Sequence, residues 1–107
     1  MILEVVQSTY SHQEGVTVIA SQPQDWYEGY DSILHFYTPA DGTGLNIQVD
    51  VVKAYCEGSV GWTVDRVKLK LPNGEELPVR HTRIFHKENG AWKLVHNHVS
   101  VAVFEEG

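Results

Sequence analysis

The spacing of hydrophobic and polar residues divides the chain into a short helical region and a longer region of alternating strands. Residues 16–20 are mostly β-branched, which predicts a short strand. The apolar spacing of residues 33–37 fits one packed face of a helix, and Asp31 or Ser32 is suited to cap its start. Pro39 favours an end to this helix.

Beyond residue 44 the pattern indicates β-strands. Apolar side chains alternate with polar ones at period two, which is typical of strands with one buried face. Asn89-Gly90 lies between two such runs, and this dipeptide is a strong hairpin signal. One helix followed by antiparallel strands predicts an α+β fold with the helix packed on a curved sheet. The expected strands cover residues 45–52, 60–71, 78–87 and 92–104.

The N-terminal segment predicts a short helix or a frayed start. Residues 1–15 contain Ser8, Ser11 and Gly15, which argue against a long helix there. The chain shows no internal repeat, linker or low-complexity tract. A length of 107 residues fits one domain, so we expect residues 1–107 to form a single unit.

Composition narrows the classes of partner. Hydrophobic residues make up 42% of the chain and charged residues 21%, as in ordinary soluble globular proteins. The formal net charge of −6 repels phosphate backbones, so no nucleic-acid partner is expected. No apolar run has the length of a membrane span, so no membrane partner is expected either. Cys56 is the only cysteine, which excludes an internal disulfide or thiolate zinc cluster and favours a cytoplasmic protein.

The C-terminal hairpin carries a family signature. A Thr-Arg-aliphatic-aromatic-His-basic run, an Asn-Gly turn, a tryptophan and Val-His-x-His-x-Ser resemble the association domain of calcium/calmodulin-dependent kinase II. They also resemble the wider SnoaL-like, or nuclear transport factor two-like, group that contains this domain. A second match begins at residues 27–29, and the resemblance covers residues 16–101. The matching hairpin residues are Thr82, Arg83, Ile84, Phe85, His86, Lys87, Asn89, Gly90, Trp92, Val95, His96, His98 and Ser100.

This resemblance implies a strongly bent antiparallel sheet that forms a cone, with one or two helices on its concave side. It also implies a cavity inside the cone and dimers formed through the sheet. Members of the group usually carry a long N-terminal helix that closes the cone. Only residues 1–15 precede the first expected strand, so we expect that helix to be short, missing or supplied by a partner subunit.

The length of the hairpin turn decides which residues share a face of the sheet. A two-residue turn places Arg83 on one face with His96, whereas a three-residue turn with Gly90 as a bulge places Arg83 with Asn97. We favour the three-residue turn, because the related association domains direct the matching arginine into the cavity. The concave face would then hold His81, Arg83, Phe85, Asn97 and Val99.

Arg83 is the main candidate for recognising a ligand, since a guanidinium binds a carboxylate through two hydrogen bonds. An ion pair with one of the acidic residues is the equal alternative. Aromatic side chains near the expected helix could line the cavity mouth or belong to the core. For a small apolar or carboxylate ligand, the predicted binding residues are Arg83, His81, Asn97, Tyr37, Trp26 and Phe85.

The histidines could also suggest a metal site. His96 and His98 are two residues apart, so their side chains point to the same side of the sheet. A stable site would need a third ligand from His81 or a carboxylate. We interpret these rings as structural and expect no metal and no cofactor.

Two functions fit these observations. The first is a small-molecule-binding or oligomerisation domain, and the second is a small isomerase, cyclase or hydratase acting on an apolar ring compound. The ketosteroid isomerase branch of the group places a catalytic carboxylate at the end of its first strand, where Ala20 stands here. An enzyme would instead use His81, Tyr37 or Asp50 as base or donor, with Arg83 fixing the substrate.

Two kinds of protein partner are also expected. One helix cannot cover a sheet of about five strands, so an apolar face should remain and pair with a second copy in a homodimer. A partner-binding module is a further alternative, in which the absent N-terminal helix leaves the cone open.

Overall fold

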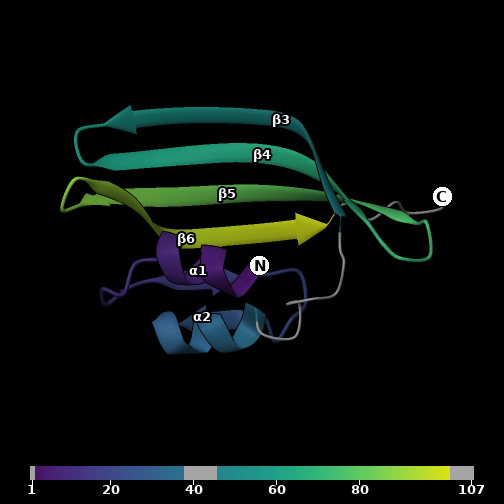
Figure 1. The fold of residues 1–107 in the computed structure, drawn as a ribbon, viewed down its shortest axis with the longest axis horizontal. Helices are drawn as coiled ribbons and strands as arrows, with labels where there is room; N and C mark the ends of the chain where they lie inside the picture. Colours follow the sequence, from purple (N-terminus) through teal and green to yellow (C-terminus); the bar gives the residue numbers. More distant parts are fainter. Residues whose placement is uncertain (1, 38–45, 102–107) are drawn as a thin grey trace.

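The computed structural model describes residues 2–37 and 46–101, which form a curled six-stranded sheet and two short helices (Figure 1). This arrangement confirms the predicted α+β class. The elements are α1 (Ile2–Thr9), β1 (Thr17–Ile19), β2 (Trp26–Glu28), α2 (Tyr30–Tyr37), β3 (Asn46–Glu57), β4 (Val60–Lys70), β5 (Glu76–Glu88) and β6 (Ala91–Val101).

The sheet is mixed rather than fully antiparallel. Its strands lie in the order β2-β1-β6-β5-β4-β3, and every neighbouring pair is antiparallel except β1 and β6. β1 joins the sheet beside the last strand and runs in the same direction, so Thr17 pairs with His96. Parallel neighbours need a long connection, which most of the chain supplies here. The short strand β2 lies in a segment for which the sequence pattern predicts no strand.

The hydrophobic core lies where the helices pack on β1 and β6. Ile33 of α2 and Val18 of β1 are both 0% exposed, and Val6 of α1 is buried beside them. The predicted cap of the second helix is wrong by a few residues, because α2 begins at Tyr30. Asp31 therefore lies in the first turn, where its charge is favourable near the helix N-terminus.

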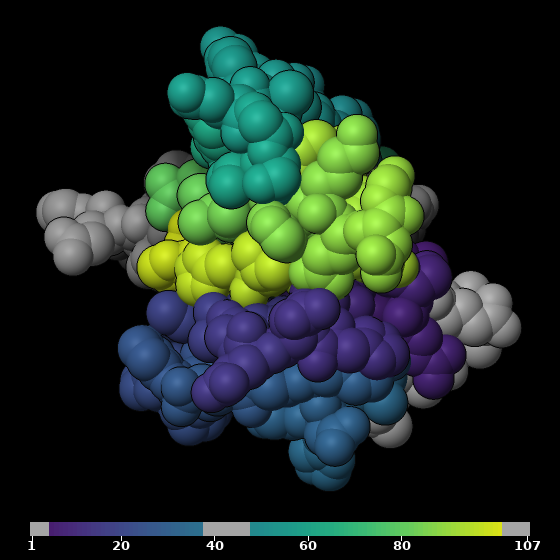
Figure 2. Space-filling model, turned by 90° about the vertical axis from the view of Figure 1, so that its left-hand side faces the viewer, coloured from purple at the N-terminus to yellow at the C-terminus, as the bar shows by residue number. Residues whose placement is uncertain are grey.

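The other half of the sheet has no such cover among the described residues. In Figure 1 both helices lie at the β6 side of the sheet. Figure 2 shows the N-terminal segments through α2, in purple and blue, on one side of β6 and the β3–β4 hairpin, in teal, on the other. Val49 and Val52 of β3 are each 57% exposed. The concave face of the sheet is thus packed at one end and open at the other.

The N-terminal helix is short, as expected. Tyr10, directly after α1, donates its backbone N–H to the Val6 carbonyl at 3.0 Å, and the backbone N–H of Ser11 donates to the Leu94 carbonyl at 2.9 Å. The first bond continues the helical pattern to Tyr10, and the second attaches this end of the helix to β6, so the helix covers part of the concave face. Of the three alternatives expected for this helix, a short helix is the one that the structure has. No described helix has the length and apolar character to cross a membrane.

The turn between β5 and β6 differs from the predicted one. Glu88 pairs with Ala91, and Asn89 and Gly90 both have positive φ, at 52° and 81°. This is a two-residue turn of the type that matches strand twist, so the three-residue interpretation is wrong.

A bulge further along β6 restores the expected face. Phe85 pairs with Leu94, but the next residue, Ile84, pairs with His96. Val95 is the extra residue, and it moves all later side chains of β6 to the other face relative to an unbulged hairpin. Arg83 consequently pairs with Asn97, as predicted, although by a different mechanism.

Candidate functional site

A pocket of about 570 Å³ lies on the concave side of the sheet, between α1 and the strands β3 to β6. Its wall is mostly aliphatic and aromatic, with polar side chains gathered in two clusters. Pockets for small molecules commonly have this composition. The lining residues are Val5, Val6, Thr9, Tyr10, Tyr37, Val49, Val52, Thr63, Asp65, Val67, His81, Arg83, Phe85, Leu94 and Asn97.

The first polar cluster is centred on Asp65 of β4. The side chain of Asp65 is only 5% exposed, and its Oδ1 atom lies 2.6 Å from Nδ1 of His81. Its second oxygen accepts a hydrogen bond from Arg83 Nη1. Asp65 pairs directly with His81 across β4 and β5, which explains why the three side chains share the concave face. The cluster therefore neutralises one carboxylate with one guanidinium.

The surroundings of His81 favour its neutral form. Burial lowers its pKa from the ordinary value of 6.5, and the positive charge of Arg83 lowers it further, against the opposing effect of Asp65. A neutral ring whose Nδ1 faces a carboxylate carries its proton on Nδ1 and donates it to that carboxylate. The lone pair of Nε2 is then the acceptor that His81 can offer to a molecule in the pocket.

The second polar cluster joins two tyrosines and an amide. The hydroxyl oxygens of Tyr10 and Tyr37 lie 2.8 Å apart, and Asn97 Nδ2 donates to them at 3.1 and 3.2 Å respectively. Burial raises the pKa of the Tyr10 hydroxyl, and the neighbouring Tyr37 raises it further, so Tyr10 keeps its proton.

The tyrosine cluster has more hydrogen-bond donors than it uses internally. One phenol donates to the other, and with the amide in this orientation the Asn97 Nδ2 group donates to both oxygens. In this orientation one phenolic hydrogen has no acceptor among the three side chains, and Asn97 Oδ1 is buried without a hydrogen-bond partner among the described residues. Tyr10 and Tyr37 line the pocket, so that hydrogen is a donor for a ligand oxygen.

Five of the six predicted ligand-binding residues line this one pocket. They are Arg83, His81, Asn97, Tyr37 and Phe85. Trp26 is not among them, because it lies on β2 at the far edge of the sheet and is 64% exposed. For Arg83 the sequence left two alternatives open, a ligand carboxylate and an ion pair within the chain. The structure has the ion pair, with Asp65.

The other candidates lie elsewhere. His96 and His98 occupy the face opposite the pocket, and His96 Nδ1 lies 2.8 Å from the hydroxyl of Thr17. Asp50, the alternative base, is the bulged residue of β3 and is exposed. Within residues 2–37 and 46–101, no three histidine, cysteine or acidic side chains are grouped so as to hold a metal ion.

Sequence reasoning missed Asp65 and Tyr10. A signal for Asp65 exists, because the period-two frame running back from Val67 and Leu69 passes through it. A charged residue in phase with the inward apolar set predicts a buried carboxylate. Tyr10 follows Val6 by four residues, which is the spacing of one helix face, although α1 ends at Thr9.

Sequence comparison gives the family. Residues 3–104 match the family model of the SnoaL-like domain. The chain belongs to the SnoaL-like family. No curated protein matches this SnoaL-like domain significantly.

Solved structures share the fold at low identity. An NTF2-like protein of unknown function from Pseudomonas putida KT2440 superposes with a TM-score of 0.83 at 12% identity, covering 97% of this SnoaL-like chain and 75% of that chain. A provisionally named calcium/calmodulin-dependent protein kinase type II association domain from Thiobacillus denitrificans gives 0.78 at 14% identity, covering 94% and 82%. A provisionally named ketosteroid isomerase from Shewanella frigidimarina gives 0.75 at 16% identity, covering 92% and 80%.

Proposed function

We propose that this SnoaL-like domain binds a small, mostly apolar molecule with one neutral polar group in the concave pocket. The observation that carries the proposal is the pairing of Asp65 with Arg83 beside a neutral His81, within a largely apolar wall. Because the two charges cancel, the pocket has little to gain from a charged ligand. A hydroxyl or carbonyl group, in contrast, would find the His81 acceptor and the tyrosine donor.

This proposal decides between the two ligand classes expected from the sequence. A carboxylate ligand would have to compete with Asp65 for Arg83 and would meet the negative charge of Asp65 itself. We therefore favour a neutral ring compound over a carboxylate.

Isothermal titration calorimetry with 4-ethylphenol and benzoate tests the proposal. Wild-type protein should bind 4-ethylphenol and bind benzoate at least about tenfold more weakly. Asp65→Asn frees the guanidinium of Arg83, so benzoate should gain affinity in that variant. Asp50→Asn, at the exposed bulge of β3, is the matched control and should change neither affinity. Benzoate binding wild-type protein as tightly as 4-ethylphenol would overturn the proposal.

Proton transfer on the bound molecule is the second candidate function. The pocket places a base, His81 Nε2 backed by Asp65, in the same wall as a protonated tyrosine cluster. His81 would remove a proton from carbon beside a carbonyl, the tyrosine would hydrogen-bond the carbonyl oxygen, and the proton would return to another carbon. The fold shared with a provisionally named ketosteroid isomerase is compatible with this chemistry.

Exchange of the α-hydrogens of cyclohexanone in deuterated water, followed by proton NMR, tests this activity. The wild-type protein should accelerate the exchange, and His81→Gln should lose about 100-fold or more of the acceleration. His98→Gln changes a histidine on the opposite face and should retain it. Equal acceleration by wild-type and His81→Gln proteins would exclude His81 as the base.

We also propose that two copies pair through the outer face of the sheet. Trp62, Val64 and Ile84 lie together on β4 and β5 and are 39%, 40% and 37% exposed. An apolar sheet face of this kind favours a twofold contact between identical chains. Light scattering after size exclusion should give a dimer for wild-type protein and a monomer for Val64→Arg. A wild-type monomer at high concentration would refute the pairing.

A further inference from the structure

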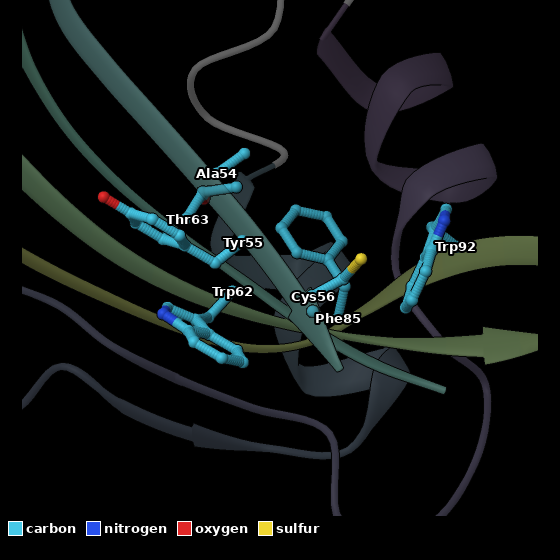
Figure 3. Close-up of a pocket in the computed structure, with 8 residues that line it drawn as sticks. Ala54, Tyr55, Cys56, Trp62, Thr63, Phe85 and Trp92 are labelled. Atoms are coloured by element: carbon cyan, nitrogen blue, oxygen red, sulfur yellow. The ribbon is translucent and has the colours of Figure 1, made fainter. Parts of the chain in front are cut away.

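A second hollow adjoins the pocket at the uncovered end of the sheet. Its volume is about 350 Å³, and no charged side chain lines it. It shares two wall residues, Thr63 and Phe85, with the larger pocket. Figure 3 shows the Cys56 sulfur between the ring of Phe85 and the indole of Trp92. The full lining is Ala54, Tyr55, Cys56, Gly61, Trp62, Thr63, Phe85 and Trp92. Tyr55 and Trp62 alternate with the inward residues, and their rings stack on the outer face.

The two hollows differ in chemistry but form a continuous wall. Strand alternation places Phe85 and Arg83 on the same face of β5, one step apart along the sheet. The polar cluster therefore lies on one side of Phe85 and the aromatic hollow on the other. A molecule lying along the concave face would meet hydrogen-bonding groups at one end and mostly apolar surface at the other, where the polar side chains are the Cys56 thiol and the Thr63 hydroxyl.

A glycine keeps this second hollow open. A Cβ atom added at Gly61 would lie 3.4 Å from Cζ3 of Trp92 and 3.7 Å from Cβ of Cys56. Any side chain longer than alanine at this position would extend into the space beside the indole. Trp92 remains 40% exposed there, so a sizeable aromatic surface is left without cover among the described residues.

We propose that the ligand of this domain is elongated, with a neutral polar head at His81 and an apolar tail that passes Phe85 into the aromatic hollow. This inference rests on the proposed function of the larger pocket and names the class of its ligand as a hydroxyl or carbonyl compound with an alkyl or aryl tail. The tail covers the indole of Trp92 and the face of β4 at Gly61. Burial of this apolar surface supplies affinity, while the polar head sets the orientation.

A series of 4-alkylphenols with ethyl, butyl, hexyl and octyl chains tests the inference by calorimetry. Affinity should rise by about fourfold per methylene until the aromatic hollow is filled, as expected for burial of each CH₂ group. The matching alkylbenzenes lack the hydroxyl and should bind more weakly at every length. An affinity that does not change with chain length would overturn the inference.

A large side chain placed in the aromatic hollow tests tail binding separately from head binding in the concave pocket. Cys56→Phe places a ring in the aromatic hollow and should abolish the advantage of the hexyl over the ethyl compound without weakening 4-ethylphenol. Glu57→Phe places the same ring on the opposite face of β3 and is the matched control, which should keep the full series. If Cys56→Phe weakens both compounds equally, the tail does not occupy this hollow.

The single cysteine gives an independent readout. Because Cys56 is exposed and is the only thiol, its alkylation by iodoacetamide reports on this hollow alone. Saturating 4-octylphenol should slow alkylation at least about tenfold, whereas 4-ethylphenol should leave the rate unchanged. Protection that increases with protein concentration in the absence of any phenol would show that a second copy fills the hollow, and would overturn the inference.

These outcomes distinguish the two proposals. If no phenol binds, the proposed function itself fails. If 4-ethylphenol binds and the longer phenols bind no better, the concave pocket stands as a binding site and only the elongated ligand is excluded.

Discussion

The two halves of the sheet are built from the same alternating pattern but differ in what covers them. At the β1–β6 half, two helices seal the concave face, and Val18 and Ile33 are fully buried. At the β3–β4 half, Val49 and Val52 point to the same concave side and remain more than half exposed. Alternation therefore decides which face a side chain takes, while the neighbouring layer decides whether that face becomes core or binding surface.

The difference separates stability from recognition. Full burial of a large aliphatic side chain stabilises a fold by about 1.5–3 kcal/mol. Most of the buried side chains lie in the covered half, so this half supplies most of the stabilisation. The uncovered half keeps its apolar surface available to a ligand. The Asp65 cluster lies on β4 and β5 between the two halves, whereas the tyrosine cluster lies where the two helices meet β6.

The largest test of this comparison is a pair of truncations to alanine, one in each half of the sheet. Ile33→Ala should lower the free energy of unfolding by about 2–5 kcal/mol, because it leaves a cavity beneath α2. Val52→Ala, in the uncovered half, should change it by no more than about 0.5 kcal/mol. Urea denaturation followed by far-ultraviolet circular dichroism measures both. Similar losses would show that the two halves contribute equally.

Two aspartates give the next largest contrast. Asp65→Ala should cost about 1–3 kcal/mol, because it removes the acceptor of both His81 and Arg83. Asp50→Ala removes an exposed carboxylate and should be close to neutral. The same denaturation assay applies. A neutral Asp65→Ala would mean that the ion pair is no better than hydration of its members.

A smaller effect is expected from one tyrosine hydroxyl. Tyr10→Phe should cost about 1 kcal/mol, because Tyr37 and Asn97 each lose a hydrogen-bond partner in a buried cluster. Tyr55→Phe changes a tyrosine that is 53% exposed and should lie within about 0.5 kcal/mol of wild type. If the two variants lose the same stability in thermal denaturation, the tyrosine cluster does not stabilise the fold.

The pH dependence gives the finest test. Burial lowers the pKa of both His81 and His96 below the ordinary value of 6.5, so the unfolded chain binds these protons more readily than the folded one. Stability from these groups is complete above pH 6.5 and declines as the pH falls below it. His81→Gln should flatten part of this decline in melting temperature, with exposed His86→Gln as the matched control. Melting temperatures that rise on acidification would contradict the assignment.

Much of the architecture could be predicted from the sequence because strands and a tight hairpin have local signatures. The period-two runs and Asn89-Gly90 indicate the long strands, and the hairpin motif indicates the family. The position of β1 beside β6 could not be predicted from spacing, because a parallel pair depends on contacts distant in sequence. The bulge at Val95 has no local signal either, since neither valine nor its neighbours require it.

The candidate site was predicted in part. Arg83, His81 and Asn97 follow from the face of the hairpin, and the structure brings them into one pocket. Asp65 was overlooked because β4 contains two sets of apolar residues in opposite phase, and the outward set ends at Val64. The placement of Trp26 was wrong because β2 carries it to an edge that the helices do not reach.

The extra residue at Val95 has a consequence for how this hairpin can evolve. Loss of one residue from β6 near this point could be absorbed by straightening the strand, so Asn97 would still oppose Arg83. β4 pairs with β5 without any irregularity, and the same deletion between Gly61 and Asp65 would turn the carboxylate outward. We therefore expect related chains to vary in length within β6, where the bulge can absorb a deletion. We expect them not to vary in length within β4.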